Sequence, residues 1–131
     1  MSDVDMHVRI SAATPEADLD AVVWPGVTSV SYARCESAQQ VRDADARITR
    51  LERLRGIRSG EVRVRPIIES ARGVARAAEI AGSSGRVGAL ELGTSITLEL
   101  GDNALDYARS ECELNARARG VLPLDPFAAY D

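Results

Sequence analysis

The residues of this chain best suited to chemistry are charged or hydroxyl-bearing side chains that directly follow short apolar segments. They are Arg9 and Ser11, Arg34 and Glu36, Glu69 and Ser70, Thr94 and Ser95, and Asp125. Taken singly, each is more often a solvated or structural residue than a functional one. If the apolar segments are parallel strands, these side chains gather at one edge of the sheet, where the sites of α/β proteins lie.

All sixteen basic residues are arginines, and the chain contains no lysine. This excludes two kinds of site, because a Schiff-base aldolase and a P-loop phosphate site both need a lysine amine. If the chain cleaves a carbon–carbon bond, a metal ion is the most plausible way to stabilise the carbanion. Cys35 ends a predicted strand and could be a reactive thiol, but a small buried apolar residue is the favoured interpretation.

The overall charge and the hydropathy limit which partners and which cellular compartment are expected. A net charge of −4 argues against non-specific nucleic-acid binding, which needs a basic surface. No stretch approaches the ~20 apolar residues of a membrane span, and the first residues do not resemble a secretory signal. We therefore expect a cytoplasmic protein with free thiols, no membrane and no nucleic-acid partner.

Short β-branched segments alternate with amphipathic ones along the chain, which predicts alternating strands and helices. Strands are expected at 6–11, 26–33, 60–70, 86–93 and 121–127, and helices at 15–24, 37–55, 70–82 and 103–120. The segment 96–101 fits either a further strand or a loop with one helical turn. Strands joined by helices are almost always parallel, so the chain of 131 residues is expected to form one α/β domain with about five parallel strands.

Local signals refine the helices. Ser37 and Gln40 have the spacing of a capping box, and Asn103 is the expected N-cap of the last helix. The charges of the second helix are predicted to form a solvated face with pairs four residues apart, such as Asp43 with Arg47.

Five collinear segments resemble one known family. The segment 66–74, with the sequence PIIESARGV, is similar to the fifth-strand motif of the citrate lyase β-chain family, also described as HpcH/HpaI aldolases. In the family's order, 8–11 resembles the third strand, 17–37 the fourth, 77–93 the sixth, and 105–125 the seventh. This resemblance implies a partial TIM-type (β/α) barrel over residues 1–131, since a complete barrel needs roughly 250 residues.

The resemblance implies a Mg²⁺-dependent carbon–carbon lyase that acts on a β-hydroxy acyl-CoA or a 2-keto acid. In such a reaction a divalent cation stabilises the enolate, and an arginine holds a carboxylate. Glu69 matches the first metal ligand and Arg9 the catalytic arginine, while Glu36 and Asp125 match acids with possible supporting roles. The alternative for Glu69 is a carboxylate that caps the helix after it.

The chain also departs from the family pattern at the site. The family's second metal ligand is an aspartate shortly after the glycine that matches Gly93, whereas this chain has Thr94 and Ser95 there and no carboxylate before Glu99. We therefore expect the lyase to be impaired when alone. The alternatives are a non-catalytic truncated remnant or assembly subunit, and a small-ligand binder with an arginine-lined anion pocket.

The family's first two strands and its last part have no counterpart in this sequence. Five strands do not close a barrel, so both sheet edges are expected to be covered by self-association or by a partner subunit. A second expectation is that inward-facing apolar residues lack packing partners. These residues are Ile10, Val30, Ile67 and Leu90.

Overall fold

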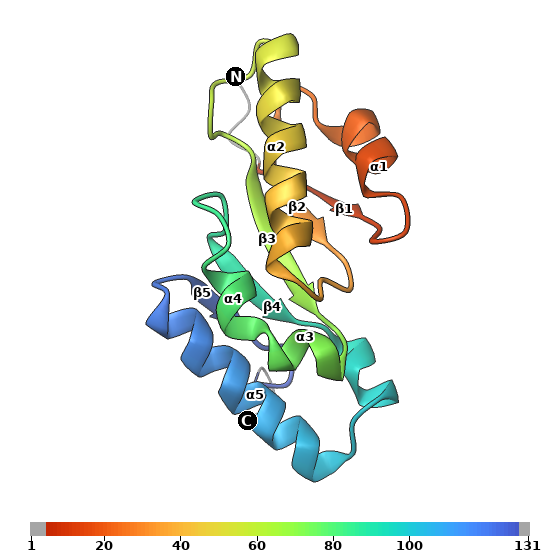
Figure 1. Ribbon diagram of the computed structural model, residues 1–131, viewed down its shortest axis with the longest axis vertical. Helices are drawn as coiled ribbons and strands as arrows, with labels where there is room; N and C mark the ends of the chain where they lie inside the picture. Colours follow the sequence, from red (N-terminus) through yellow and green to blue (C-terminus); the bar gives the residue numbers. More distant parts are fainter. Residues whose placement is uncertain (1–4, 129–131) are drawn as a thin grey trace.

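The computed structural model describes residues 5–128, which form a parallel sheet with helices packed on it (Figure 1). In chain order the elements are β1 (Met6–Ile10), α1 (Pro15–Val22), β2 (Val27–Tyr32), α2 (Ala38–Leu54), β3 (Arg63–Ile68), α3 (Ala71–Ala75), α4 (Ala77–Ala81), β4 (Ala89–Leu92), the 3₁₀ helix η1 (Thr94–Leu98), α5 (Asp102–Ala118) and β5 (Leu122–Leu124). None of the helices within these described residues is long and apolar enough to cross a membrane.

The sheet has the order β1-β2-β3-β4-β5, and each strand pairs in parallel with the next along the chain. Because each right-handed crossover steps in the same direction, the helices lie on one face of the sheet. Figure 1 views this face, with α2 and the α3–α4 pair in front of the strands. The predicted fold class is confirmed: an α/β architecture of five parallel strands with flanking helices.

The two faces of the sheet differ sharply in polarity. Across β1, β2 and β3 the register aligns an apolar row, Val8, Val30 and Val64, which belongs to the core or packs against it. The neighbouring rows alternate to the other face. They are polar, and comprise His7, Ser29 and Arg63, then Arg9, Ser31 and Arg65. We call this second, helix-free side the open face.

The expectation that inward-facing apolar residues lack partners is wrong. Ile10, Val30 and Leu90 are each at most 1% exposed and belong to the core beneath the helices, and Ile67 is also buried. For Ile10, Val30 and Leu90 the predicted side was off by one residue, because a shift of one position moves every side chain to the opposite face. Ile67 alternates with the core residue Ile68 and shares its face with Arg65, so the residues that face away from the helices are mostly polar.

Most helix boundaries follow the prediction, with local differences. The Ser37–Gln40 capping box is present, but α5 begins at Asp102 with Gly101 as its N-cap, so the prediction of Asn103 at that position is wrong. The predicted helix at 70–82 is two short helices, because Arg76 leaves helical geometry between them. The ambiguous segment contains η1, the helical-turn alternative.

The predicted pair of Asp43 with Arg47 does not form. Arg47 instead reaches across to α1, where its guanidinium donates two hydrogen bonds to Asp20. Asp43 accepts a hydrogen bond from Gln39 of its own helix. A tertiary partner with good bidentate geometry displaces a local pair that is worth only a few tenths of a kcal/mol.

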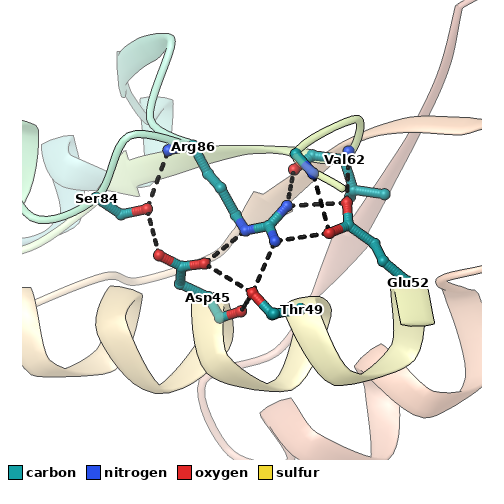
Figure 2. Close-up of polar contacts among 7 residues, drawn as sticks. Asp45, Thr49, Glu52, Val62, Ser84 and Arg86 are labelled. Atoms are coloured by element: carbon teal, nitrogen blue, oxygen red, sulfur yellow. Dashed lines mark hydrogen bonds and ion pairs between the residues drawn. The ribbon is translucent and has the colours of Figure 1, made fainter. Parts of the chain in front are cut away.

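A buried ionic network joins α2 to the segments that precede β3 and β4 (Figure 2). The Arg86 guanidinium donates to Glu52 at 2.7 and 2.9 Å and to Asp45 at 2.6 Å. Glu52 is 1% exposed and also accepts the backbone N–H groups of Gly60 and Val62. The network therefore holds the amino-terminal ends of the neighbouring strands β3 and β4 against α2.

The hydrogen bonds of this network set the protonation of its carboxylates. Burial raises the pKa of Glu52, but hydrogen bonds from Arg86 and from two backbone amides outweigh it and hold that pKa below its ordinary range. The pKa of Asp45 is likewise lowered against burial, by Arg86 and Ser84. Both carboxylates stabilise the fold above their ordinary pKa range, and this contribution is lost as the pH falls through the lowered values.

We predict that Arg86→Ala destabilises the fold by about 3–5 kcal/mol, because it leaves the buried Glu52 carboxylate without its cation. Arg117→Ala is the matched control, since Arg117 makes an exposed pair with Glu113, and such pairs contribute about 0.5 kcal/mol or less. Urea unfolding followed by circular dichroism measures both free energies. Equal effects of the two substitutions would contradict the structural role given to Arg86.

Candidate active site

A buried carboxylate lies at the carboxyl end of β3. Glu69 follows this strand directly, and its side chain is 7% exposed. Its Oε1 accepts the backbone N–H of Arg34 at 3.0 Å and Arg9 Nη2 at 3.3 Å, and its Oε2 accepts the Ser95 hydroxyl at 2.6 Å. Glu69 is thus the point where groups that follow or end β1, β2 and β4 meet.

The backbone of Arg34, which donates its N–H to Glu69, has an unusual conformation. Its φ of 50° makes it the one residue other than glycine with positive φ among residues 5–128. This left-handed conformation costs about 1–2 kcal/mol for a side chain of this kind, and it accompanies the N–H contact to Glu69. Strain of this sort gathers at functional sites, where the surrounding structure holds it in place.

Gly93 at the end of β4 makes room for the Glu69 side chain. A Cβ atom at Gly93 would lie 2.5 Å from Cγ of Glu69 and 2.9 Å from Cγ2 of Ile67, closer than such atoms approach. The turn after Gly93 then starts η1 and brings Ser95 to Glu69. The glycine is therefore required by packing against the carboxylate.

Two cavities at this end of the sheet share Arg9, whose side chain is 63% exposed, and the smaller of them is lined by Glu69. The smaller cavity, about 190 Å³, is bounded by Glu69, Glu91 and Ser95 among others. The larger, about 660 Å³, lies at the ends of β1 and β2 and is bounded by Ser11 and Arg34. Both volumes suit parts of a small ligand.

The other two predicted acids lie near the site but touch different partners. Glu36 accepts the hydroxyl of Ser70 at 2.6 Å, and Ser70 is the N-cap of α3 directly after Glu69. Asp125 forms an ion pair with Arg109 at 2.8 Å and accepts the backbone N–H of Phe127. Glu36 thus contacts the residue beside Glu69, whereas the observed bonds of Asp125 hold the turn after β5.

The alternative role for Glu69, capping the following helix, belongs to other residues. Ser70 accepts the N–H of Gly73, and Glu99 accepts the N–H of Ala71 at 3.0 Å. Glu99 was the first carboxylate after Gly93 in the sequence, and in the structure it serves this helix terminus. The bonds of Glu69 are directed across the strand ends instead.

Sequence reasoning missed Glu91. It lies within β4, its carboxylate borders the small cavity with Glu69, and its ion-pair contact with Arg65 is 3.7 Å long. The signal was present as a single charged residue inside an otherwise apolar strand, Ala89–Leu92. It was overlooked because only side chains that follow the strands were considered as candidates.

The thiol of Cys35 is not part of this chemistry. The residue is fully buried, and burial raises the pKa of its thiol to about 12. A thiol with so high a pKa is not a nucleophile at neutral pH. The interpretation of Cys35 as a small buried apolar residue is confirmed.

The donors at the site are hard oxygen atoms: the carboxylates of Glu69 and Glu91 and the hydroxyl of Ser95. Mg²⁺ takes such ligands and commonly binds through one or two carboxylates, with water completing its octahedron. Within residues 5–128, no three histidine, cysteine, aspartate or glutamate side chains come together. The arrangement thus fits a hydrated Mg²⁺ and lacks the nitrogen and sulfur ligands of a structural zinc site.

We predict that Arg34→Gly stabilises the fold by about 0.5–1 kcal/mol, because glycine adopts positive φ without the penalty that a Cβ brings. Arg58→Gly is the control, since Arg58 is exposed and its φ is not positive; there the same change is expected to destabilise. Urea unfolding measures both effects. Loss of stability in Arg34→Gly would show that the Arg34 side chain stabilises the fold by more than the strain it causes.

Sequence comparison places these residues among known proteins. A model of the family described as HpcH/HpaI aldolase/citrate lyase matches residues 2–130. The chain is 30% identical over 133 aligned residues to the citrate lyase subunit beta of Haemophilus influenzae and, likewise, to that of Escherichia coli K12. The alignments cover 94% of this chain but 46% and 44% of those relatives, so the chain spans less than half of their length.

Solved structures give the same picture. The CitE protein of Mycobacterium tuberculosis in complex with magnesium and pyruvate superposes with a TM-score of 0.70 at 28% identity, over 91% of this chain and 49% of that one. A malate synthase of Haloferax volcanii shares the fold, with a TM-score of 0.76 at 16% identity over 94% and 40% of the two chains. With the family match over nearly its whole length, this chain belongs to the HpcH/HpaI aldolase/citrate lyase family.

Proposed function

We propose that this chain contributes the site of a divalent-cation-dependent carbon–carbon lyase, with Glu69 as a metal ligand and Arg9 as the catalytic arginine. The observation that carries the proposal is the Glu69 carboxylate itself. It is buried at the carboxyl end of β3, borders a cavity and has an exposed guanidinium beside it. In parallel α/β folds, this end of the strands is where substrates bind.

When bound, Mg²⁺ supplies the charge that stabilises an enolate oxygen. The chain's own residues bind and orient the substrate around it. Arg9 is 63% exposed and is joined to Glu69 by a bond of 3.3 Å, so its remaining N–H groups are available to hold a carboxylate of the substrate in bidentate fashion. Ser95 and the amide of Arg34 hold the Glu69 carboxylate in place.

The relatives support the substrate class. The M. tuberculosis CitE protein has been solved with magnesium together with pyruvate or acetoacetate, both small oxo acids. We propose that this chain acts on a related 2-keto acid or on a β-hydroxy acyl-CoA, in the cytoplasm. Glu36 would support the site through Ser70, and Asp125 through the turn that brings Pro126 to the small cavity.

The second candidate is a non-catalytic member of the family, a remnant or assembly subunit. The observation in its favour is that both oxygens of Glu69 already accept internal hydrogen bonds, from Arg9, Arg34 and Ser95. A carboxylate satisfied in this way is stable without a metal ion. Metal affinity at Glu69 therefore separates the two candidates.

We predict that Mn²⁺, used as a paramagnetic substitute for Mg²⁺, binds the wild-type chain with a dissociation constant in the micromolar to low millimolar range. Glu69→Gln should weaken binding by at least about tenfold, because it removes a charged ligand but keeps the side-chain shape. Electron paramagnetic resonance of free Mn²⁺ measures the affinity. The control is Glu79→Gln, an exposed carboxylate of α4, which should leave it unchanged.

Two results would count against the lyase proposal. One is the absence of Mn²⁺ binding up to millimolar concentrations, and the other is equal binding by wild type and Glu69→Gln. Either would favour the non-catalytic candidate. Circular dichroism of each variant shows whether a loss of binding reflects the site or the fold.

We further propose that residues 1–131 act as one incomplete barrel domain whose sheet is completed by a partner, either a second copy or another subunit. Among the described residues, β1 pairs with β2 alone and β5 with β4 alone, so each edge strand presents unpaired backbone groups. Such edges associate readily with other strands. The exposed Met6 and Leu122 lie on these two edge strands.

We predict that the purified chain elutes as a dimer or larger species rather than as a 14.0 kDa monomer. Light scattering coupled to size-exclusion chromatography measures the mass directly. Replacing Leu122 with lysine, which protects an edge strand by its charge, should shift the population towards monomer. A monodisperse wild-type monomer with the circular dichroism of a folded α/β protein would refute the proposal for self-association.

A further inference from the structure

Positive charge is concentrated at the carboxyl end of α2. Residues 46–60 hold five arginines and a single acid, Glu52. That acid is 1% exposed and already forms an ion pair with Arg86, so it does not offset the charge at the surface. Since the whole chain carries a net charge of −4, this excess of cations is a local feature of the molecule.

Three of these five arginines are exposed and form no hydrogen bond or ion pair within residues 5–128. They are Arg50, Arg53 and Arg58. The other two are engaged by groups of the chain. Arg47 donates two hydrogen bonds to Asp20, and Arg55 donates one to the carbonyl of Val23 at 2.6 Å. The three exposed guanidinium groups are therefore left to bind anions from outside the chain.

Two large apolar side chains are exposed beside these cations. Leu54 is 70% exposed and lies four residues after Arg50, on the same face of α2. Trp24 is 51% exposed, and the Arg55 guanidinium lies 3.7 Å from the centre of its ring. This cation–π contact holds the ring in place and covers one of its faces. We call this surface the α2-end patch, and it consists of Trp24, Arg50, Arg53, Leu54, Arg55 and Arg58.

The α2-end patch and the candidate active site lie at opposite ends of β3. The patch surrounds the end of α2, which precedes β3, whereas Glu69 follows that strand. Six residues of β3, about 20 Å of strand, separate the two ends. Figure 1 shows the carboxyl end of α2 at the top of the molecule and α3, which comes after Glu69, well below it. A partner bound at the patch therefore leaves the cavities that share Arg9 open.

We propose that the α2-end patch is a docking surface for a partner protein that presents an acidic segment with apolar side chains. Tryptophan and arginine are the residue types that most often dominate the binding energy of protein interfaces. Guanidinium groups bind carboxylates through two parallel N–H groups. Leu54 and the uncovered face of Trp24 supply apolar contact area next to them.

An acidic protein fits this surface better than a nucleic acid does. Single-stranded nucleic acids bind along basic grooves in which successive bases stack on several aromatic rings. The patch has one such ring, and Arg55 covers one of its faces. The net charge of −4 also repels a polyanion that extends beyond the patch. The patch residues belong to α2 and the segments beside it, so this docking is independent of the edge strands and of Glu69.

The test titrates the full chain with a short synthetic peptide of glutamate and leucine, and with the same peptide carrying glutamine in place of glutamate. Calorimetry measures the affinities, and the fluorescence of Trp24, the only tryptophan of the chain, reports binding at the patch. Arg50→Gln/Arg53→Gln removes two cations of the patch. Arg72→Gln/Arg76→Gln is the matched control, because it removes two exposed arginines from the segment of α3 and α4.

We expect the glutamate peptide to bind wild type about tenfold more tightly than the glutamine peptide, because several exposed ion pairs each add a small contribution. Arg50→Gln/Arg53→Gln should weaken the glutamate peptide about fivefold, while the control variant equals wild type. Added salt should weaken this binding. Leu54→Gln should weaken both peptides alike, since it removes apolar contact and no charge. Circular dichroism verifies that each variant is folded.

Four results would overturn the proposal. The first two are no binding of the glutamate peptide, and equal binding of it by wild type and Arg50→Gln/Arg53→Gln. The third is tighter binding of an oligothymidylate of the same charge, which would assign the patch to a nucleic acid. The fourth is a loss of self-association in Arg50→Gln/Arg53→Gln, seen by light scattering, which would show that a second copy occupies the patch.

Discussion

The interaction on which the rest of the structure depends is the Arg86 guanidinium buried between Glu52 and Asp45. It connects α2 to the segments that precede β3 and β4, so it fixes the starting points of these two neighbouring strands. Because the two strands are parallel, their relative position at the start also sets their relative position at the carboxyl ends, where Glu69 follows β3 and Gly93 follows β4. The ionic network therefore acts at one end of the sheet and the candidate site lies at the other, the division between stability and chemistry that is typical of parallel (β/α) folds.

The site end carries its own constraint, because a carboxylate that is 7% exposed must have its hydrogen bonds satisfied. Glu69 obtains them from three segments, and one of the three adopts a strained backbone at Arg34 to provide its share. The absence of a side chain at Gly93 leaves the space that the Glu69 side chain occupies. The fold tolerates backbone strain and lost packing at this end of the sheet because the hydrophobic core and the Arg86 network stabilise it elsewhere.

The sequence predicted what depends on local patterns and a well-marked motif. The strand–helix alternation, the Ser37 capping box and the placement of Glu69 at a strand end all follow from neighbouring residues. The ion pairs between residues far apart in the sequence could not be predicted in this way. Arg86 and Glu52 are 34 residues apart in the sequence. Arg47 binds Asp20 of the neighbouring helix α1 and not a residue of its own helix. Ile10, Val30 and Leu90 were assigned to the wrong face of the sheet, and Glu91 was missed because only side chains that follow the strands were considered as candidates.

The register of the strands also places mostly polar and charged side chains on the open face of the sheet. Its rows hold Arg9, Arg65 and Glu91, and Arg65 Nη1 forms an ion pair with Glu91 Oε1 at 3.7 Å. The Nε atom of Arg65 is buried without a hydrogen-bond partner. An apolar partner surface would remove these charged side chains from water, at a desolvation cost of several kcal/mol. A chain that covers this face must therefore bring acceptors or leave water there, which keeps the neighbourhood of Glu69 polar and hydrated.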